Sequence, residues 1–127
     1  MTKKILSTDQ APGSPLYSQG VRVGSRIYVS GMPGIDPVTN QLAGTTIQEQ
    51  TRQALANCAA VLAAGGGTLA DVAQVTVLLA NPADFAGMNE AYASVFATDP
   101  PARAVTRLGP DLPNLLVSIM MTADIDT

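Results

Sequence analysis

The stretch that most constrains the fold is residues 115–123, which read Leu-Leu-Val-Ser-Ile-Met-Met-Thr-Ala. In a strand with one face in water, apolar and polar residues alternate, because only the other face meets the core. This run is apolar on both faces, which predicts a strand at the centre of a sheet or one buried in a subunit contact. Both faces of that sheet therefore need a cover.

Two helices are predicted between the strands. Thr46 followed by Glu49 is a capping box, and apolar residues with helical spacing continue until the three glycines at 65–67. The second helix begins at Asn81-Pro82, where Asn can cap and Pro occupies the first helical position. Its expected apolar stripe consists of Phe85, Met88, Tyr92 and Phe96.

The remaining strands follow from turn residues and branched side chains. Residues 21–23 and 26–29 flank Gly24-Ser25, which predicts a hairpin, and residues 30–34 (Ser-Gly-Met-Pro-Gly) are expected to break its second strand. Residues 71–79 form the clearest strand, and a further one follows Arg103. Lys3-Lys4 are expected on a frayed terminus. The order predicts an α+β fold, with two helices on one face of a mixed sheet.

Composition indicates how the other sheet face is covered. The chain has 127 residues, enough for one domain, and 46% of them are hydrophobic while only 13% are charged. An average soluble domain has about 25% charged residues. Too few charges remain to cover a monomer, so we expect other subunits to hide part of the surface.

Several kinds of site are disfavoured. The net charge of -3 argues against nucleic-acid binding, which depends on Lys and Arg. With no His and a single Cys58, thiolate metal clusters, zinc sites and His-based triads are excluded, and no metal or organic cofactor is predicted. Cys58 is expected in the core. No run of about 18 apolar residues predicts a membrane span, and a cytoplasmic protein is expected.

Arg103 is the best candidate for chemistry. It follows Pro100-Pro101-Ala102, where a loop enters a strand, in a chain poor in reactive side chains. Its guanidinium stays charged and presents a planar fork that grips a carboxylate with two parallel hydrogen bonds. A surface arginine beside a proline turn is the alternative interpretation.

A set of loop and strand-end residues shares its order with one family. The set comprises Tyr17, Val29-Ser30-Gly31, Asp36-Pro37 with Thr39, Asn89 with Tyr92, Pro101-Ala102-Arg103, and Leu112-Pro113 before the last strand. In this combination the chain resembles the RidA/YjgF family of enamine/imine deaminases, also called endoribonuclease L-PSP-like, over nearly all of its length.

The resemblance implies a chorismate-mutase-like α+β fold with a six-stranded mixed sheet. It also implies homotrimers whose sheets form a central barrel, with clefts between subunits. In such clefts Arg103 would bind the substrate carboxylate, while Tyr17, Ser30, Gly31 and Asn89 would lie in or near the pocket. Partners would be a small carboxylated imine or keto acid.

The chain departs from the family pattern at the positions that would help to place the reacting water. The last-strand position that is usually Glu is Ser118, and the next alternate position is Met120. Met32 replaces the usual Gln after Ser-Gly, and Val105 stands where Cys is frequent. We therefore assign Arg103, Ser118 and Tyr17 catalytic roles as a hypothesis. Substrate contacts are expected from Arg103, Ser30, Gly31, Met32, Asn89 and Val105.

Three functions remain open at this stage. The first is hydrolysis of small 2-imino acids, or of a related pathway-specific imine such as an aminomuconate-like intermediate. The second is a non-catalytic, regulatory trimer that binds a small carboxylate, which the changes at Ser118 and Met120 motivate. The third, an endoribonuclease, is disfavoured by the acidic charge and the lack of His.

Overall fold

The structure, a computed structural model, describes residues 2–125. Its main sheet has the strand order β1-β2-β3-β8-β6-β7. These strands span Lys3–Leu6 (β1), Gly20–Val23 (β2), Arg26–Pro33 (β3), Val72–Leu79 (β6), Ala102–Arg107 (β7) and Val117–Asp124 (β8). All neighbours pair antiparallel except β6 and β7, which are parallel.

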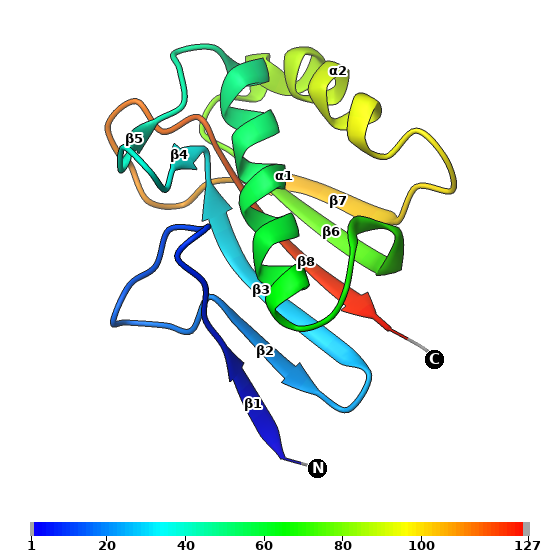
Figure 1. The fold of residues 1–127 in the computed structure, drawn as a ribbon. Helices are drawn as coiled ribbons and strands as arrows, with labels where there is room; N and C mark the ends of the chain where they lie inside the picture. The colour runs from blue at the N-terminus through cyan, green and yellow to red at the C-terminus, as the bar shows by residue number, and fades with distance from the viewer. Residues whose placement is uncertain (1, 126–127) are drawn as a thin grey trace.

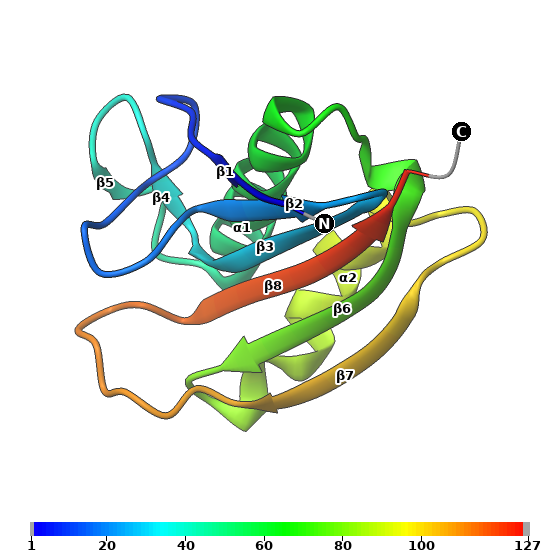
Figure 2. The ribbon, with the colours of Figure 1, turned by 90° about the horizontal axis from the view of Figure 1, so that it is seen from below.

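Helices α1 (Ile47–Ala64) and α2 (Phe85–Val95) pack on the same face of this sheet, as Figures 1 and 2 show. Short 3-10 turns precede β6 (η1, Leu69–Asp71) and α2 (η2, Pro82–Asp84), and a small hairpin joins β4 (Ile35–Asp36) to β5 (Gln41–Leu42). The predicted α+β fold, with a six-stranded mixed sheet and two helices on one face, is confirmed. No helix within residues 2–125 is long and apolar enough to cross a membrane.

Helix α1 begins and ends at the predicted residues. The Thr46 hydroxyl accepts a hydrogen bond from the Glu49 amide at 3.2 Å, and the Glu49 carboxylate accepts one from the Thr46 amide at 3.2 Å. The side-chain hydrogen bond from Thr46 is the main cause of the lowered pKa of Glu49. Gly66 adopts φ +89°, and the Gly67 amide returns to the Leu62 carbonyl, which closes the helix.

The apolar run near the C-terminus becomes β8, the central strand between β3 and β6, as predicted. Its buried side faces the helices with Val117, Ile119, Met121 and Ala123. The opposite side carries Ser118, Met120, Thr122 and Asp124, so it is largely polar and the expectation of a strand that is apolar on both faces was wrong. Met120 on this side is 45% exposed. Neither helix of the described residues packs on this second face of the sheet (Figure 2).

Two expectations about strands were wrong. The N-terminus is not frayed at Lys3, because β1 pairs with β2 along its length. The second hairpin strand does not break at Ser30; β3 continues to Pro33 through a bulge between Val29 and Met32. A bulge absorbs an extra residue while pairing resumes beyond it, which a break signal read from Gly and Pro does not reveal.

Cys58 lies in the core on α1, as expected, and is fully buried. Its thiol donates to the Ile119 carbonyl at 3.4 Å. Burial raises the pKa of this thiol, so no thiolate is present at neutral pH. Cys58 therefore belongs to the packing between α1 and β8 and carries no nucleophile.

Candidate functional site

Arg103 is directed toward α2 by its register in the sheet. Asp99 takes a left-handed φ of 48° and two prolines follow, so the chain turns sharply before β7 begins at Ala102. Arg103 is paired with Val75 of β6, whose side chain is buried under the helices. Because paired residues point to the same face, the arginine projects on the helix side at the edge of the sheet.

Side chains of α2 hold the guanidinium in place. Its Nη1 donates to the Asn89 side-chain oxygen at 2.7 Å, and Cζ lies 4.7 Å from the centre of the Tyr92 ring. The Phe85 ring centre is 5.9 Å from the same atom. These contacts orient the planar fork and add cation–π attraction.

Most donors of Arg103 remain available. No carboxylate oxygen within residues 2–125 approaches the guanidinium to 4.0 Å, and the side chain is exposed. A guanidinium has five N–H donors, and the bonds from Nη1 to Asn89 and to the Met88 sulfur use two of them. The arrangement is thus suited to bind an external carboxylate.

Tyr92 forms the floor beneath Arg103. The side chain is 6% exposed, and its ring centre lies 4.9 Å from that of Phe96. Burial raises the pKa of the phenol, while the nearby Arg103 charge opposes that change. The hydroxyl is buried and has no hydrogen-bond partner among residues 2–125. Tyr92 therefore acts as a platform for the cation.

The predicted residues on β3 and β8 form a second group. Within the bulge, a Cβ added to Gly31 would lie 2.9 Å from the Ser118 hydroxyl oxygen, so these two residues are neighbours. Ser118 points to the helix-free face, since Val117 and Ile119 beside it are buried under the helices. The absence of a side chain at Gly31 leaves the Ser118 hydroxyl accessible for a bound molecule.

Met32 does not join this group through its side chain. It resumes the pairing after the bulge, opposite Ile119, and is fully buried in the core. The family resemblance implied a cleft position for Met32, because it stands where the family usually has Gln after Ser-Gly. The bulge shifts the alternation by one residue and turns Met32 inward.

Tyr17 lies on the loop between β1 and β2 and is 46% exposed. Ser30 ties this loop to β3: its hydroxyl donates to the Ser18 carbonyl at 2.5 Å, and its amide donates to the Gln19 carbonyl at 2.9 Å. The Ser30 side chain thus positions the Tyr17 loop, a role that sequence patterns did not predict.

Gln19 is the second anchor of that loop. Its side-chain oxygen accepts from the Thr8 amide at 2.8 Å, and its Nε2 donates to the carbonyls of Thr8, Ala11 and Pro12 at 2.9–3.0 Å. The residue is 8% exposed. A glutamine in a polar loop carries no sequence signal for such burial.

We expect Gln19→Ala to release the loop, because four hydrogen bonds are lost and three carbonyls and an amide lose a partner. The cost should be about 2–3 kcal/mol, which lowers the Tm by about 10 °C. Limited proteolysis should cut within residues 7–19 faster. The control is Gln10→Ala, in the same loop, whose side chain only donates to Asp9. Equal effects of the two variants would contradict this account.

The candidate residues fall on opposite faces of the sheet. Arg103, Asn89 and Val105 lie on the helix side, where Val105 pairs with the buried Val77. Gly31 and Ser118 are neighbours on β3 and β8, with Ser118 on the helix-free side, and Ser30 ties the loop that carries Tyr17 to β3. One chain does not bring the two groups together, so a site that uses both groups must combine two chains.

Phe85 is a contributor that sequence analysis assigned to the core. It is the first residue of α2 and is 46% exposed. Met88, Tyr92 and Phe96 of the same stripe are buried as expected. Its exposure beside Arg103 makes Phe85 part of the site's rim.

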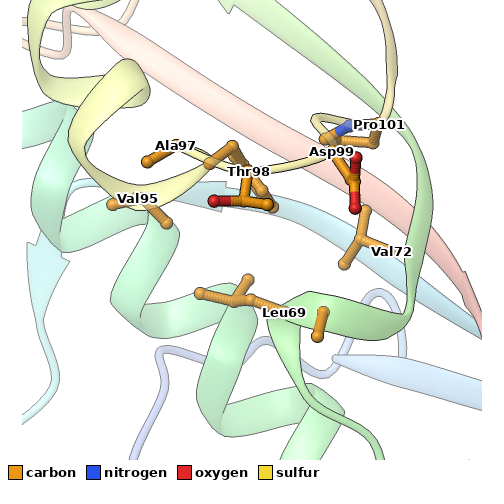
Figure 3. Close-up of a pocket in the computed structure, with 9 residues that line it drawn as sticks. Leu69, Val72, Val95, Ala97, Thr98, Asp99 and Pro101 are labelled. Atoms are coloured by element: carbon orange, nitrogen blue, oxygen red, sulfur yellow. The ribbon is translucent and has the colours of Figure 1, made fainter.

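A separate hollow lies at the other end of α2, as Figure 3 shows. It is lined by Leu69, Ala70, Val72, Val95, Phe96, Ala97, Thr98, Asp99 and Pro101. Its only charged side chain is Asp99, which would repel a carboxylate, so this hollow does not suit the ligand that Arg103 favours. No group of three or more His, Cys, Asp or Glu suited to a metal ion occurs among the described residues.

Comparison with known proteins connects this geometry to a family. The family model described as Endoribonuclease L-PSP matches residues 8–125. A RutC family protein of Saccharolobus solfataricus is 41% identical over 123 residues, covering 95% of this chain and 97% of that protein. The human 2-iminobutanoate/2-iminopropanoate deaminase is 41% identical over 105 residues, covering 82% of this chain and 77% of the human protein.

A solved structure gives the same result. The RidA crystal structure from the Antarctic bacterium Psychrobacter sp. PAMC 21119 matches with a TM-score of 0.89 and 34% identity, covering 96% of this chain and 99% of the other. Fold, family model and sequence similarity all agree over nearly the whole length. The chain therefore belongs to the RidA/YjgF family, whose family model is described as Endoribonuclease L-PSP.

Proposed function

We propose that this protein is a deaminase that hydrolyses small 2-imino acids, or a related carboxylated imine, to 2-keto acids and ammonia. The observation that carries the proposal is the Arg103 guanidinium, oriented by Asn89 and Tyr92 with its remaining donors exposed. Relatives at about 41% identity are named 2-iminobutanoate/2-iminopropanoate deaminases, which supports this choice of substrate.

The proposed active site lies between subunits of a homotrimer. The two groups of candidate residues occupy opposite faces of one sheet, which supports a cleft in which Arg103 of one chain faces Ser118 and Tyr17 of the next. The helix-free face also exposes Tyr28 and Met120, at 42% and 45%, which favours burial in an assembly.

The reaction needs placement more than strong acids or bases. Arg103 would hold the substrate carboxylate so that the imine carbon faces a water on Ser118. The water oxygen bonds to that carbon, the C=N electron pair moves to nitrogen, and one proton of the water is transferred to that nitrogen. In the resulting carbinolamine the O–H proton passes to the amino group, which leaves as ammonia as the C=O bond forms. Fixing water and imine together supplies much of the rate gain.

A second candidate function is binding of a small carboxylate without turnover. Ser118 favours this alternative, because a hydroxyl orients water but is a poor base at neutral pH. The ligand would then be a 2-keto acid held by Arg103, and its occupancy would regulate a partner.

A coupled assay separates the two functions. An amino-acid oxidase generates 2-iminopropanoate or 2-iminobutanoate, semicarbazide traps the imine, and the protein competes by hydrolysing it. Less trapped imine with this protein supports the deaminase. Unchanged trapping together with binding of 2-oxobutyrate supports the binding function. Unchanged trapping without binding of 2-oxobutyrate would contradict both functions.

We expect Ser118→Glu to increase deaminase turnover by about tenfold or more, because a carboxylate adjacent to the water can accept its proton. Ser118 lies on the helix-free face, where a longer side chain does not enter the core. The control is Thr122→Glu, on the same face of β8 but further along the strand. Equal turnover of Ser118→Glu and the parent protein would argue against a water site at Ser118.

A further inference from the structure

A second arginine shares the face and the strand of Arg103. Arg107 stands four residues further along β7, opposite Leu79 of β6, whose side chain is buried under the helices. Residues that are two and four apart in a strand point to the same side, so Arg103, Val105 and Arg107 form one row. Their outer members are about 13 Å apart at Cα.

An apolar hollow lies beside Arg107 on this edge of the sheet. It is lined by Leu79, Pro82, Phe85, Val105, Thr106 and Arg107. The half-exposed Phe85 ring belongs to this hollow, and its centre lies 5.9 Å from Cζ of Arg103, so the Arg103 guanidinium stands beside the Phe85 edge of the hollow. In the part of the chain that the structure describes, no carboxylate oxygen lies within 4.0 Å of Arg107.

A hollow of this kind distinguishes between imino acids. The imine of alanine has only one carboxylate and leaves Arg107 without a counter-charge. A substrate with a second carboxylate, separated by methylene groups, matches an apolar wall with a cation at each end. The Arg103 guanidinium is held on α2, whereas Arg107 has a long exposed side chain that can reach toward a molecule bound at Arg103, and each arginine can form a charge-assisted pair.

We propose that Arg107 binds a second carboxylate and that the preferred substrates are imines of dicarboxylic amino acids, such as 2-iminoglutarate. This inference rests on the proposed carboxylate clamp at Arg103. Arg107 is thus a specificity-determining residue, while hydrolysis of the imine proceeds as for any 2-imino acid.

The test measures binding of the stable keto-acid products, so it does not require turnover. Affinities for 2-oxoglutarate and 2-oxobutyrate are determined by calorimetry for the parent protein, Arg107→Gln, Arg107→Lys and the exposed control Arg52→Gln on α1. We expect the parent to bind 2-oxoglutarate about tenfold more tightly, the preference to vanish in Arg107→Gln and to persist in Arg52→Gln. Arg107→Lys should keep part of it.

Each outcome is informative. If Arg107 had a purely structural role, Arg107→Gln would lower the affinities for both keto acids equally and leave their ratio unchanged. That result would overturn the proposal. Equal affinities in the parent protein, or no binding of either ligand, would also overturn it. The imine-trapping assay is run in parallel: a tenfold preference without turnover would leave Arg107 as an anion site while contradicting the deaminase.

Discussion

Replacing Arg103 by alanine is expected to weaken the binding of 2-oxobutyrate by at least about a hundredfold and to remove any imine hydrolysis. Each lost charge-assisted hydrogen bond costs about 1.5–3 kcal/mol, and a bidentate carboxylate loses two. Arg103→Lys should recover only a small part, because a point charge does not replace the fork. Calorimetry and the imine-trapping assay measure both effects.

A second variant tests the same clamp without removing the arginine. Asn89→Asp places a carboxylate where the amide oxygen now lies, 2.7 Å from Nη1, so an internal ion pair would compete with the ligand. The affinity of Asn89→Asp for 2-oxobutyrate should fall, while its thermal stability stays the same or rises. Arg52→Ala, an exposed arginine on α1, is the matched control. Full binding by Arg103→Ala would exclude the clamp.

The second large effect is expected at Gly34, directly after β3. A Cβ at this position would lie 2.5 Å from the Gln50 carbonyl oxygen and 2.7 Å from its Cα, both parts of the backbone of α1. Neither atom can rotate away, so β3 and α1 must separate. Separation would also strain the bonds from the buried Asn57 amide to the Pro33 and Ile35 carbonyls, both 2.9 Å.

Gly34→Ala should therefore cost about 3 kcal/mol or more and lower the Tm by about 10 °C. Because Pro33 ends the strand that carries the Ser30-Gly31 bulge, ligand affinity should fall as well. Gly109→Ala is the control, since a Cβ there has no neighbouring atom within 4 Å. Similar melting temperatures for the two variants would mean that α1 and β3 are less tightly packed than the structure indicates.

The locally determined parts of the fold were predictable. The capping box of Thr46 and Glu49, the hairpin turn at Gly24 and the left-handed Asn40 depend on residues a few positions apart. The pairing of β1 was not predictable, because Lys3-Lys4 resembles a solvated terminus and the stabilising partner, β2, is remote in sequence.

The candidate site shows the same division. Arg103 at the entry of a strand, and its hydrogen-bond partner Asn89, could be proposed from sequence together with the family resemblance, and the structure places them in contact. Phe85 and Gln19 could not be proposed from sequence. An aromatic residue in the apolar stripe of a helix is expected in the core, and a glutamine in a loop is expected to be exposed to solvent. The position of Phe85 follows from where α2 begins relative to the sheet, and that of Gln19 follows from how its loop folds back.

By itself the sequence determined the element types, the central apolar strand and the residue best suited to hold a carboxylate, because side-chain chemistry and short-range periodicity are local properties. Only the tertiary structure decided that Arg103 and Ser118 occupy opposite faces of the sheet and that Met32 enters the core. The reason is register. The parallel pairing of β6 with β7 and the bulge in β3 choose the face of every side chain beyond them, and both are set by contacts between distant segments.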